Sequence, residues 1–301
     1  MSLRINNNIE SMVAHRNLLQ NDRALSKSLE RLASGQKINR AADDPAALVI
    51  SEHMRAQVSG MEQAIRNNEV AISLVQTAEG SMNEISSLLV SLRQRAISAA
   101  NVGASDEAMI DANQSEIENS LASIDRIVSS TQFGHYKLLD GTNAEQTLED
   151  GSTREGLRFH VGPNADHMAA VSIRDMNTSQ LGRVEEGQVP NKSNFVSLAD
   201  IDVRNEQGAQ DALNIIDKAI TEVATVRGEL GAFQKHTLES NLTSLQVAAE
   251  NMTAAESTLR DTDMAKELAT FTRNQIMSQS ATAQLAQANA MPQHILRLLN
   301  G

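Results

Sequence analysis

The residues that could carry out chemistry are few and widely spaced. His160 and His167, with Asp166 beside them, could meet across a hairpin and bind a metal ion, but histidines in a loop region are more typical of a protein surface. Asp43 and Asp44 resemble an acid pair, although their place at the start of a helix explains them as capping residues. The sequence contains no HExxH pattern and no glycine-rich phosphate loop. We therefore predict no catalytic residue, no metal and no cofactor.

The composition also argues against a pocket-based enzyme. The 301 residues include five Phe, one Tyr, no Trp and no Cys. Aromatic side chains usually dominate ligand pockets, and the lack of Cys excludes thiolate metal sites, disulfides and cysteine nucleophiles. The net charge of −12, without a basic cluster, argues against nucleic acid as a partner. A hydrophobic content of 41% still allows a core of aliphatic residues, which favours long helices packed along narrow seams.

The sequence lacks the usual targeting signals. Its first eight residues, MSLRINNN, do not contain the apolar stretch of a secretory signal peptide. No segment approaches the ~18 apolar residues of a membrane span. We expect no membrane insertion. If export requires a signal peptide of this kind, the protein would stay in the cytosol.

The clearest pattern is a heptad repeat in the first third of the chain. Apolar residues step by four and three from Met54 to Ala99, with polar Asn68 and Glu79 in two positions of the same register. This pattern predicts one long helix that begins near Asp43. An earlier leucine-rich helix is expected to end near Gly35, and a later one to begin with Ser105 as its N-cap.

The rest of the chain alternates between strand and helix signals. Residues 133–200 contain alternating apolar residues around a Gly-Pro-Asn turn, which predicts one or two β-hairpins. Helical spacing returns at Ala212 and continues to Leu259, with a single step of five between Phe233 and Leu238. We predict a mainly α fold in which the N- and C-terminal segments form a long antiparallel helical bundle or coiled coil, with a small β-hairpin region in the middle.

The last segment has an unusual composition. Asn274 to Gln293 contains no charged residue, and half of its residues are Asn, Gln, Ser or Thr. We expect Pro292 to end the last long helix. Two interpretations stay open: a disordered polar tail, or a helix enclosed on all sides by neighbouring chains in a polymer.

Both ends of the chain resemble bacterial flagellin. The resemblance covers about residues 1–140 and 209–301, and the middle resembles nothing that we can name. The motifs that carry it are ERLASGQKINRAADDP at residues 30–45, QTAEG at 76–80, IDRI at 124–127, TQF at 131–133, LRDTDMA at 259–265, LAQAN at 285–289 and ILRLL at 295–299.

The resemblance implies a structural role and a location outside the cell. A flagellin is the subunit of the flagellar filament, is exported unfolded through the flagellar type III apparatus, and polymerises beneath a cap to serve swimming motility. The implied partners are other copies of the chain, an export chaperone, the filament cap and the hook-associated junction proteins. The alternatives are a hook–filament junction protein and a monomeric secreted adhesin or immune ligand.

The resemblance also implies a division into domains. Residues 1–44 and 260–301 would form the inner terminal domain, and residues 45–140 and 205–259 the long bundle. Residues 141–204 would be a short β-rich central part of the bundle domain, without large outer domains.

The candidate site residues follow from the same resemblance. The residues expected at filament contacts are Ile5, Ile9, Leu18, Leu25, Leu29, Leu32, Phe271, Leu285, Ile295, Leu298 and Leu299. The export chaperone would bind Met264, Leu268, Phe271, Ile276 and Leu285.

A strip on the first long bundle helix aligns with the flagellin surface that a Toll-like receptor recognises. Arg93 and Glu116 match the family pattern, whereas Ser91 stands in place of Arg and Arg95 in place of Leu. These changes remove a hydrogen-bond donor and replace an apolar contact with a charge, which argues against recognition by that receptor.

Overall fold

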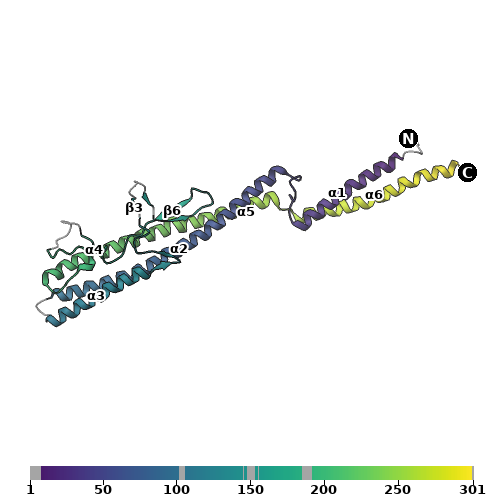
Figure 1. Ribbon diagram of the computed structural model, residues 1–301. Helices are drawn as coiled ribbons and strands as arrows, with labels where there is room; N and C mark the ends of the chain where they lie inside the picture. Colours follow the sequence, from purple (N-terminus) through teal and green to yellow (C-terminus); the bar gives the residue numbers. More distant parts are fainter. Residues whose placement is uncertain are drawn as a thin grey trace. The chain divides into compact units, whose positions relative to one another are not determined.

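A computed structural model describes residues 8–101, 106–144, 146–147, 153–154, 156–184 and 192–299, with side chains except at 146–147, 153–154 and 292–299. The chain divides into two compact units (Figure 1). The terminal unit comprises Met1–Val58 with Glu250–Gly301, and the bundle unit comprises Ser59–Ala249. These limits fall inside helices, whereas the predicted limit at 44/45 coincides with the start of a helix and the one at 259/260 lies one residue before the end of another. The predicted domain division therefore stays a prediction.

The main elements described in the terminal unit are helices. It contains α1 (Ile9–Ser34), the start of α2 (Pro45–Ala100), the end of α5 (Ser240–Arg260) and α6 (Met264–Leu299). The Asn8 side chain accepts a hydrogen bond from Ser11 N (3.1 Å) and caps α1. Gly35 ends α1 as expected, in the left-handed conformation at φ 70° that glycine adopts without strain.

The bundle unit is held by one aliphatic core. Helix α2 packs with α3 (Glu107–Ser130) and α4 (Glu206–Ala232) around this core (Figure 1). The ion pairs Arg93–Asp217 and Glu79–Arg227 show that α2 and α4 run antiparallel. The heptad positions of α2 that are fully buried include Val75, Met82, Ile85, Leu89, Leu92, Ala96 and Ala99. The heptad pattern therefore predicted the buried face correctly from Val75 onwards, whereas Ile65 and Ile72 of the predicted seam are only half-buried.

The step of five in the sequence has a structural counterpart. Between α4 and α5 the chain forms a π-helical segment, η2 (Phe233–Glu239), and Leu238 within it is buried. A π turn accommodates one more residue than an α turn. The segment therefore absorbs the odd residue and keeps the apolar positions on both sides directed into the core.

Short hairpins cover one side of the bundle unit. The paired strands are β1 (Gln132–Phe133) with β2 (Tyr136–Lys137), β3 (Gln146–Thr147) with β4 (Thr153–Arg154), and β5 (Leu157–His160) with β6 (Met168–Val171), and a 3₁₀ turn, η1, spans Leu198–Asp200. Buried Asn68 and half-buried Asn241 both donate their side-chain amides to Val161 O, at 3.3 and 2.5 Å. These bonds fix the β5–β6 hairpin to α2 and α5. The predicted fold class is confirmed.

Two details of the predicted helices are wrong. The N-cap of α3 is Asp106, whose carboxylate accepts from Met109 N (2.8 Å), and Ser105 lies outside the described residues. Helix α6 also continues through Pro292 to Leu299. A proline inside a helix removes only one backbone hydrogen bond, and the helix-favouring residues after it, three of them Leu, let the helix continue. In the described residues, no helix combines the length and the apolar character needed to cross a membrane.

The core of the bundle unit can be tested with two adjacent residues of α2. Leu89 is fully buried and Val90 is exposed. We expect Leu89→Ala to lower the free energy of unfolding by about 2–5 kcal/mol, because it leaves a cavity, and Val90→Ala to change it by less than about 0.5 kcal/mol. Urea denaturation followed by circular dichroism measures both. Equal effects at the two positions would contradict the core assignment.

Candidate functional site

Helices α1 and α6 lie side by side and run antiparallel (Figure 1). Side-chain hydrogen bonds join them at several levels: Asn8 Nδ2 to Ala288 O (2.8 Å), Ser278 Oγ to Asp22 Oδ1 (2.8 Å), Asn21 Nδ2 to Met277 O (3.3 Å) and Asn274 Nδ2 to Ser28 Oγ (3.4 Å). The bonds show that polar side chains occupy much of the contact between the two helices. We call α1 and α6 the terminal pair.

The buried residues of the terminal pair are small or polar. They are Ala14 and Ser28 on α1 and Glu267, Ala281 and Ala288 on α6. In the described side chains of residues 9–34 and 264–291, no Leu, Ile, Val, Met or Phe is buried. The terminal pair therefore contacts itself through small residues and leaves its large apolar side chains partly or fully in water.

The predicted filament-contact residues with described side chains are either exposed or half-buried. Ile9 and Leu29 are exposed, with 59% and 50% of their surface accessible. The half-buried members of the set are Leu18, Leu25, Leu32, Phe271 and Leu285. Ile5 lies outside the described residues, and the side chains of Ile295, Leu298 and Leu299 are not described.

Sequence reasoning missed several exposed apolar residues of the terminal pair. They are Met12, Val13, Leu19, Met277 and Met291. These residues lie off the heptad seam, so a search for seam positions passes over them. The usable signal was an apolar residue on a helix face where a soluble protein would carry Lys or Glu.

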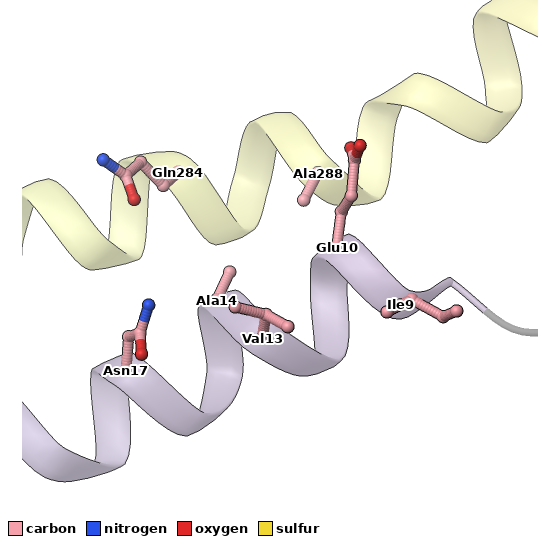
Figure 2. Close-up of a pocket in the computed structure, with 7 residues that line it drawn as sticks. All are labelled: Ile9, Glu10, Val13, Ala14, Asn17, Gln284 and Ala288. Atoms are coloured by element: carbon pink, nitrogen blue, oxygen red, sulfur yellow. The ribbon is translucent and has the colours of Figure 1, made fainter. Parts of the chain in front are cut away.

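A groove of about 320 Å³ opens along the terminal pair. Figure 2 shows it between the two helices, with Glu10, Ala14 and Asn17 extending from α1 towards α6. The remaining lining residues are Ile9, Val13, Gln284 and Ala288. Four of the seven lining residues are apolar and three, Glu10, Asn17 and Gln284, are polar, so the groove could accept a side chain of mixed character from outside.

One ion pair of the terminal pair is incomplete. Arg31 Nη1 lies 3.7 Å from Glu267 Oε2. Arg31 Nε and Glu267 Oε1 are buried without a hydrogen-bond partner in the part of the chain that the structure describes. Burying a charged group with unmade hydrogen bonds is unfavourable, so the pair contributes little to the stability of a single chain.

Two short segments next to the terminal pair, residues 35–37 and 260–262, pair with each other. Lys37 N donates to Arg260 O (2.6 Å), Thr262 N donates to Gly35 O (2.9 Å), and Gln36 forms an antiparallel bridge with Asp261. We call this paired region the joint. It ties the end of α1 to the start of α6.

Asp43 holds the turn between α1 and α2 and does not cap a helix. Its carboxylate pairs with Lys27 Nζ (2.6 Å) and accepts from Arg40 N and Asn39 N (3.2 and 3.3 Å). Asp44 alone caps α2, by accepting from Ala47 N (3.0 Å). The hydrogen bond from Lys27 and those from the backbone lower the pKa of Asp43 to about 2. The capping interpretation was wrong for Asp43 because the sequence does not show that Lys27 folds back beside it.

The other candidates from the sequence are surface groups. The receptor-like strip is exposed at both arginines: Arg93 Nε donates to Asp217 Oδ1 and Arg95 pairs with Glu116, each at 2.6 Å, while Ser91 is half-buried. Across the described ranges, no group of three or more His, Asp or Glu side chains is placed to hold a metal ion.

The fold and the site define a helical structural protein whose distinctive surface is an apolar face on a terminal helix pair. Comparison with known proteins agrees with this class. Residues 5–144 match the bacterial flagellin N-terminal helical region, and residues 213–299 match the bacterial flagellin C-terminal helical region.

Full-length relatives carry the same description. A flagellin of Bacillus subtilis (strain 168) is 40% identical over 308 residues, which cover 99% of this chain and 100% of that protein. A flagellar filament 31.3 kDa core protein of Treponema maltophilum is 39% identical over 295 residues, 98% of this chain and 99% of that protein. The chain belongs to the bacterial flagellin family.

A solved structure supports the fold alone. A protein assigned as a flagellar hook-associated protein of Vibrio parahaemolyticus superposes with a TM-score of 0.58 over 73% of this chain and 100% of that chain, at 15% identity.

The Asp43–Lys27 contact predicts an acid-dependent stability. The pKa of Asp43 is about 2 when folded against an ordinary 3.8, so below about pH 4 the unfolded chain binds the proton first. The stability from this contact is present above pH 4 and is lost as the pH falls to about 2. We expect Lys27→Met to move the pKa of Asp43 towards 3.8 and to weaken this dependence, as measured by carboxyl NMR titration.

A matched control is Lys235→Met, in the bundle unit, which should leave the Asp43 titration unchanged. An unaltered pKa of Asp43 in Lys27→Met would show that the lysine contact does not set it.

Proposed function

We propose that this chain is a structural subunit that polymerises with identical copies into the bacterial flagellar filament, outside the cell. The observation that carries the proposal is the inverted packing of the terminal pair. Its described large apolar side chains are exposed or half-buried, and its buried positions hold only small or polar residues. Such a surface is favourable only when other chains cover it.

The energetics favour repetition of the same contact. Burying one large aliphatic side chain contributes about 1.5–3 kcal/mol. A head-to-tail contact between identical subunits that does not close into a ring propagates as a helical polymer. Because each subunit touches several neighbours, modest contacts add up to a stable filament.

The net negative charge of the chain lies almost entirely in the bundle unit, and the terminal unit is nearly neutral. The terminal unit contains 12 Lys and Arg and 11 Asp and Glu, whereas the bundle unit contains 14 and 27. Bundles would repel one another at low ionic strength, while the nearly neutral terminal units would not. This distribution supports assembly through the terminal unit.

Export and the remaining partners extend the proposal. We propose that the chain leaves the cell unfolded through the flagellar type III apparatus, which needs no cleaved signal peptide. An export chaperone would bind α6, where Met264, Leu268 and Ile276 are exposed and Phe271 and Leu285 are half-buried. Growth would take place beneath a filament cap, on a base of hook-associated junction proteins, and the filament would serve swimming.

We further propose that the receptor-like strip is a solvated face of the bundle. Arg93 and Arg95 already direct their guanidinium groups to Asp217 and Glu116. An incoming receptor would have to break these pairs. Ser91 and Arg95, which differ from the family pattern, also argue against recognition by the receptor.

The assembly surface can be tested with two exposed isoleucines. We expect Ile276→Ser, on α6, to raise the critical concentration for polymerisation by roughly 10–100-fold, because it removes the apolar area that a neighbouring subunit would bury. Ile97→Ser, on the exposed face of α2, is the matched control and should change it by less than about threefold. Pelleting assays and electron microscopy of the purified full chain measure both.

A folded chain that forms no filaments under any condition of salt or seeding would contradict the proposal and favour a monomeric adhesin. Equal effects of the two serine variants would contradict the choice of surface.

A further inference from the structure

The chain has a single kind of oxidisable sulfur. It contains twelve Met and no Cys, so thioethers are the only sulfur groups that an oxidant could modify. In the described residues, Met61, Met82 and Met176 are buried in the bundle unit, Met54 and Met252 are half-buried, and six others are exposed. The exposed ones are Met12, Met109, Met168, Met264, Met277 and Met291.

Four of the six exposed methionines lie on the terminal pair. Met12 is on α1, and Met264, Met277 and Met291 are on α6, with 44% to 68% of each residue accessible. Ser11 Oγ donates to Asn289 Oδ1 (2.7 Å), so Met12 and Met291 lie at the same end of the terminal pair. Met277 lies further along, level with Asn21, which donates to its carbonyl. The thioethers are therefore distributed along the whole pair.

We propose that these four methionines form a reversible, oxidant-sensitive modification site that controls filament growth. The oxidant is a peroxide. The methionine sulfur donates an electron pair to one oxygen of hydrogen peroxide, an S–O bond forms and the O–O bond breaks. The proton on the transferred oxygen passes to the departing hydroxide, which leaves as water. Methionine is oxidised to the sulfoxide and the peroxide is reduced. The inference rests on the proposed function, because the four side chains must be accessible before assembly and enclosed after it.

The location of these residues explains why oxidation would act on assembly. A thioether is apolar and flexible, and adapts to a neighbouring surface. A sulfoxide is polar and accepts hydrogen bonds, so burying it against apolar side chains is unfavourable. Met277 and Met291 also lie in the uncharged segment Asn274–Gln293, which offers no ammonium or guanidinium group of its own to pair with the new oxygen. Four oxidised sites in every subunit would weaken each repeated contact.

The fold of the bundle unit would be spared. Its buried methionines are shielded by the core, and peroxide reacts with accessible sulfur first. Met109 on α3 and Met168 on β6 are exposed to 48% and 40% and would be oxidised at a similar rate. They lie outside the terminal pair, so their oxidation should not affect growth. They provide an internal control.

The experiment uses the purified full-length chain as a soluble monomer treated with hydrogen peroxide. Peptide mapping by mass spectrometry identifies the oxidised positions, circular dichroism follows the helical content, and pelleting gives the critical concentration. We expect sulfoxides at the six exposed positions, an unchanged helical signal from the bundle, and a critical concentration raised by about tenfold or more. Treatment with methionine sulfoxide reductases of both stereospecificities should restore growth.

Two variants separate the sites. The four-residue variant Met12→Leu, Met264→Leu, Met277→Leu and Met291→Leu cannot be oxidised on the terminal pair and should polymerise equally well before and after peroxide. The control variant Met109→Leu and Met168→Leu should lose growth after peroxide as the unsubstituted chain does.

Unchanged growth of a chain that carries all four sulfoxides would overturn the inference while leaving the proposed function intact. Loss of growth in the four-residue variant after peroxide would overturn it as well, because the effect would then arise elsewhere. A chain that fails to polymerise before any oxidation would contradict the proposed function, and the inference with it.

Discussion

The structure depends on a mismatch within the terminal helix pair. Helices α1 and α6 meet through Ala14, Ser28, Ala281 and Ala288, while their leucine, isoleucine and methionine side chains stay partly or fully accessible. Small residues bring two backbones close together but bury little apolar area. The bundle unit shows the opposite arrangement, because its large aliphatic residues fill a continuous core. One chain therefore combines a bundle that has its own core with a terminal pair that, in our proposal, gains most of its apolar burial from other copies.

Much of the fold could be predicted because its helices follow regular spacing. The heptad pattern located the core face of α2, and the step of five before Leu238 marked the place where the helix changes to a π turn. The termini of α3 and α6 were less predictable. A cap depends on which of several adjacent polar residues reaches the backbone, and Pro292 breaks a helix only if the residues after it cannot sustain one.

The candidate site was predictable in location and only partly in detail. The uncharged segment that begins at Asn274 indicated a helix surface that neighbouring chains cover. The pairing of Lys27 with Asp43 was invisible, because it depends on how the chain turns after Gly35. Exposed residues such as Val13 and Leu19 were also missed, since heptad reasoning selects residues that face a partner helix in the same chain. In the terminal pair, residues off that seam share the exposed apolar surface with the predicted Ile9 and Leu29.

Hydrogen–deuterium exchange on the full chain, as monomer and as filament, tests most directly whether the terminal pair needs other copies. We predict that backbone amides of α1 and α6 exchange rapidly in the monomer and become at least about a thousandfold slower in the filament, while amides in the core-facing part of α2 are protected in both. Equal, strong protection of α1 and α6 in the solitary chain would contradict the account, because the ends would then be stable by themselves.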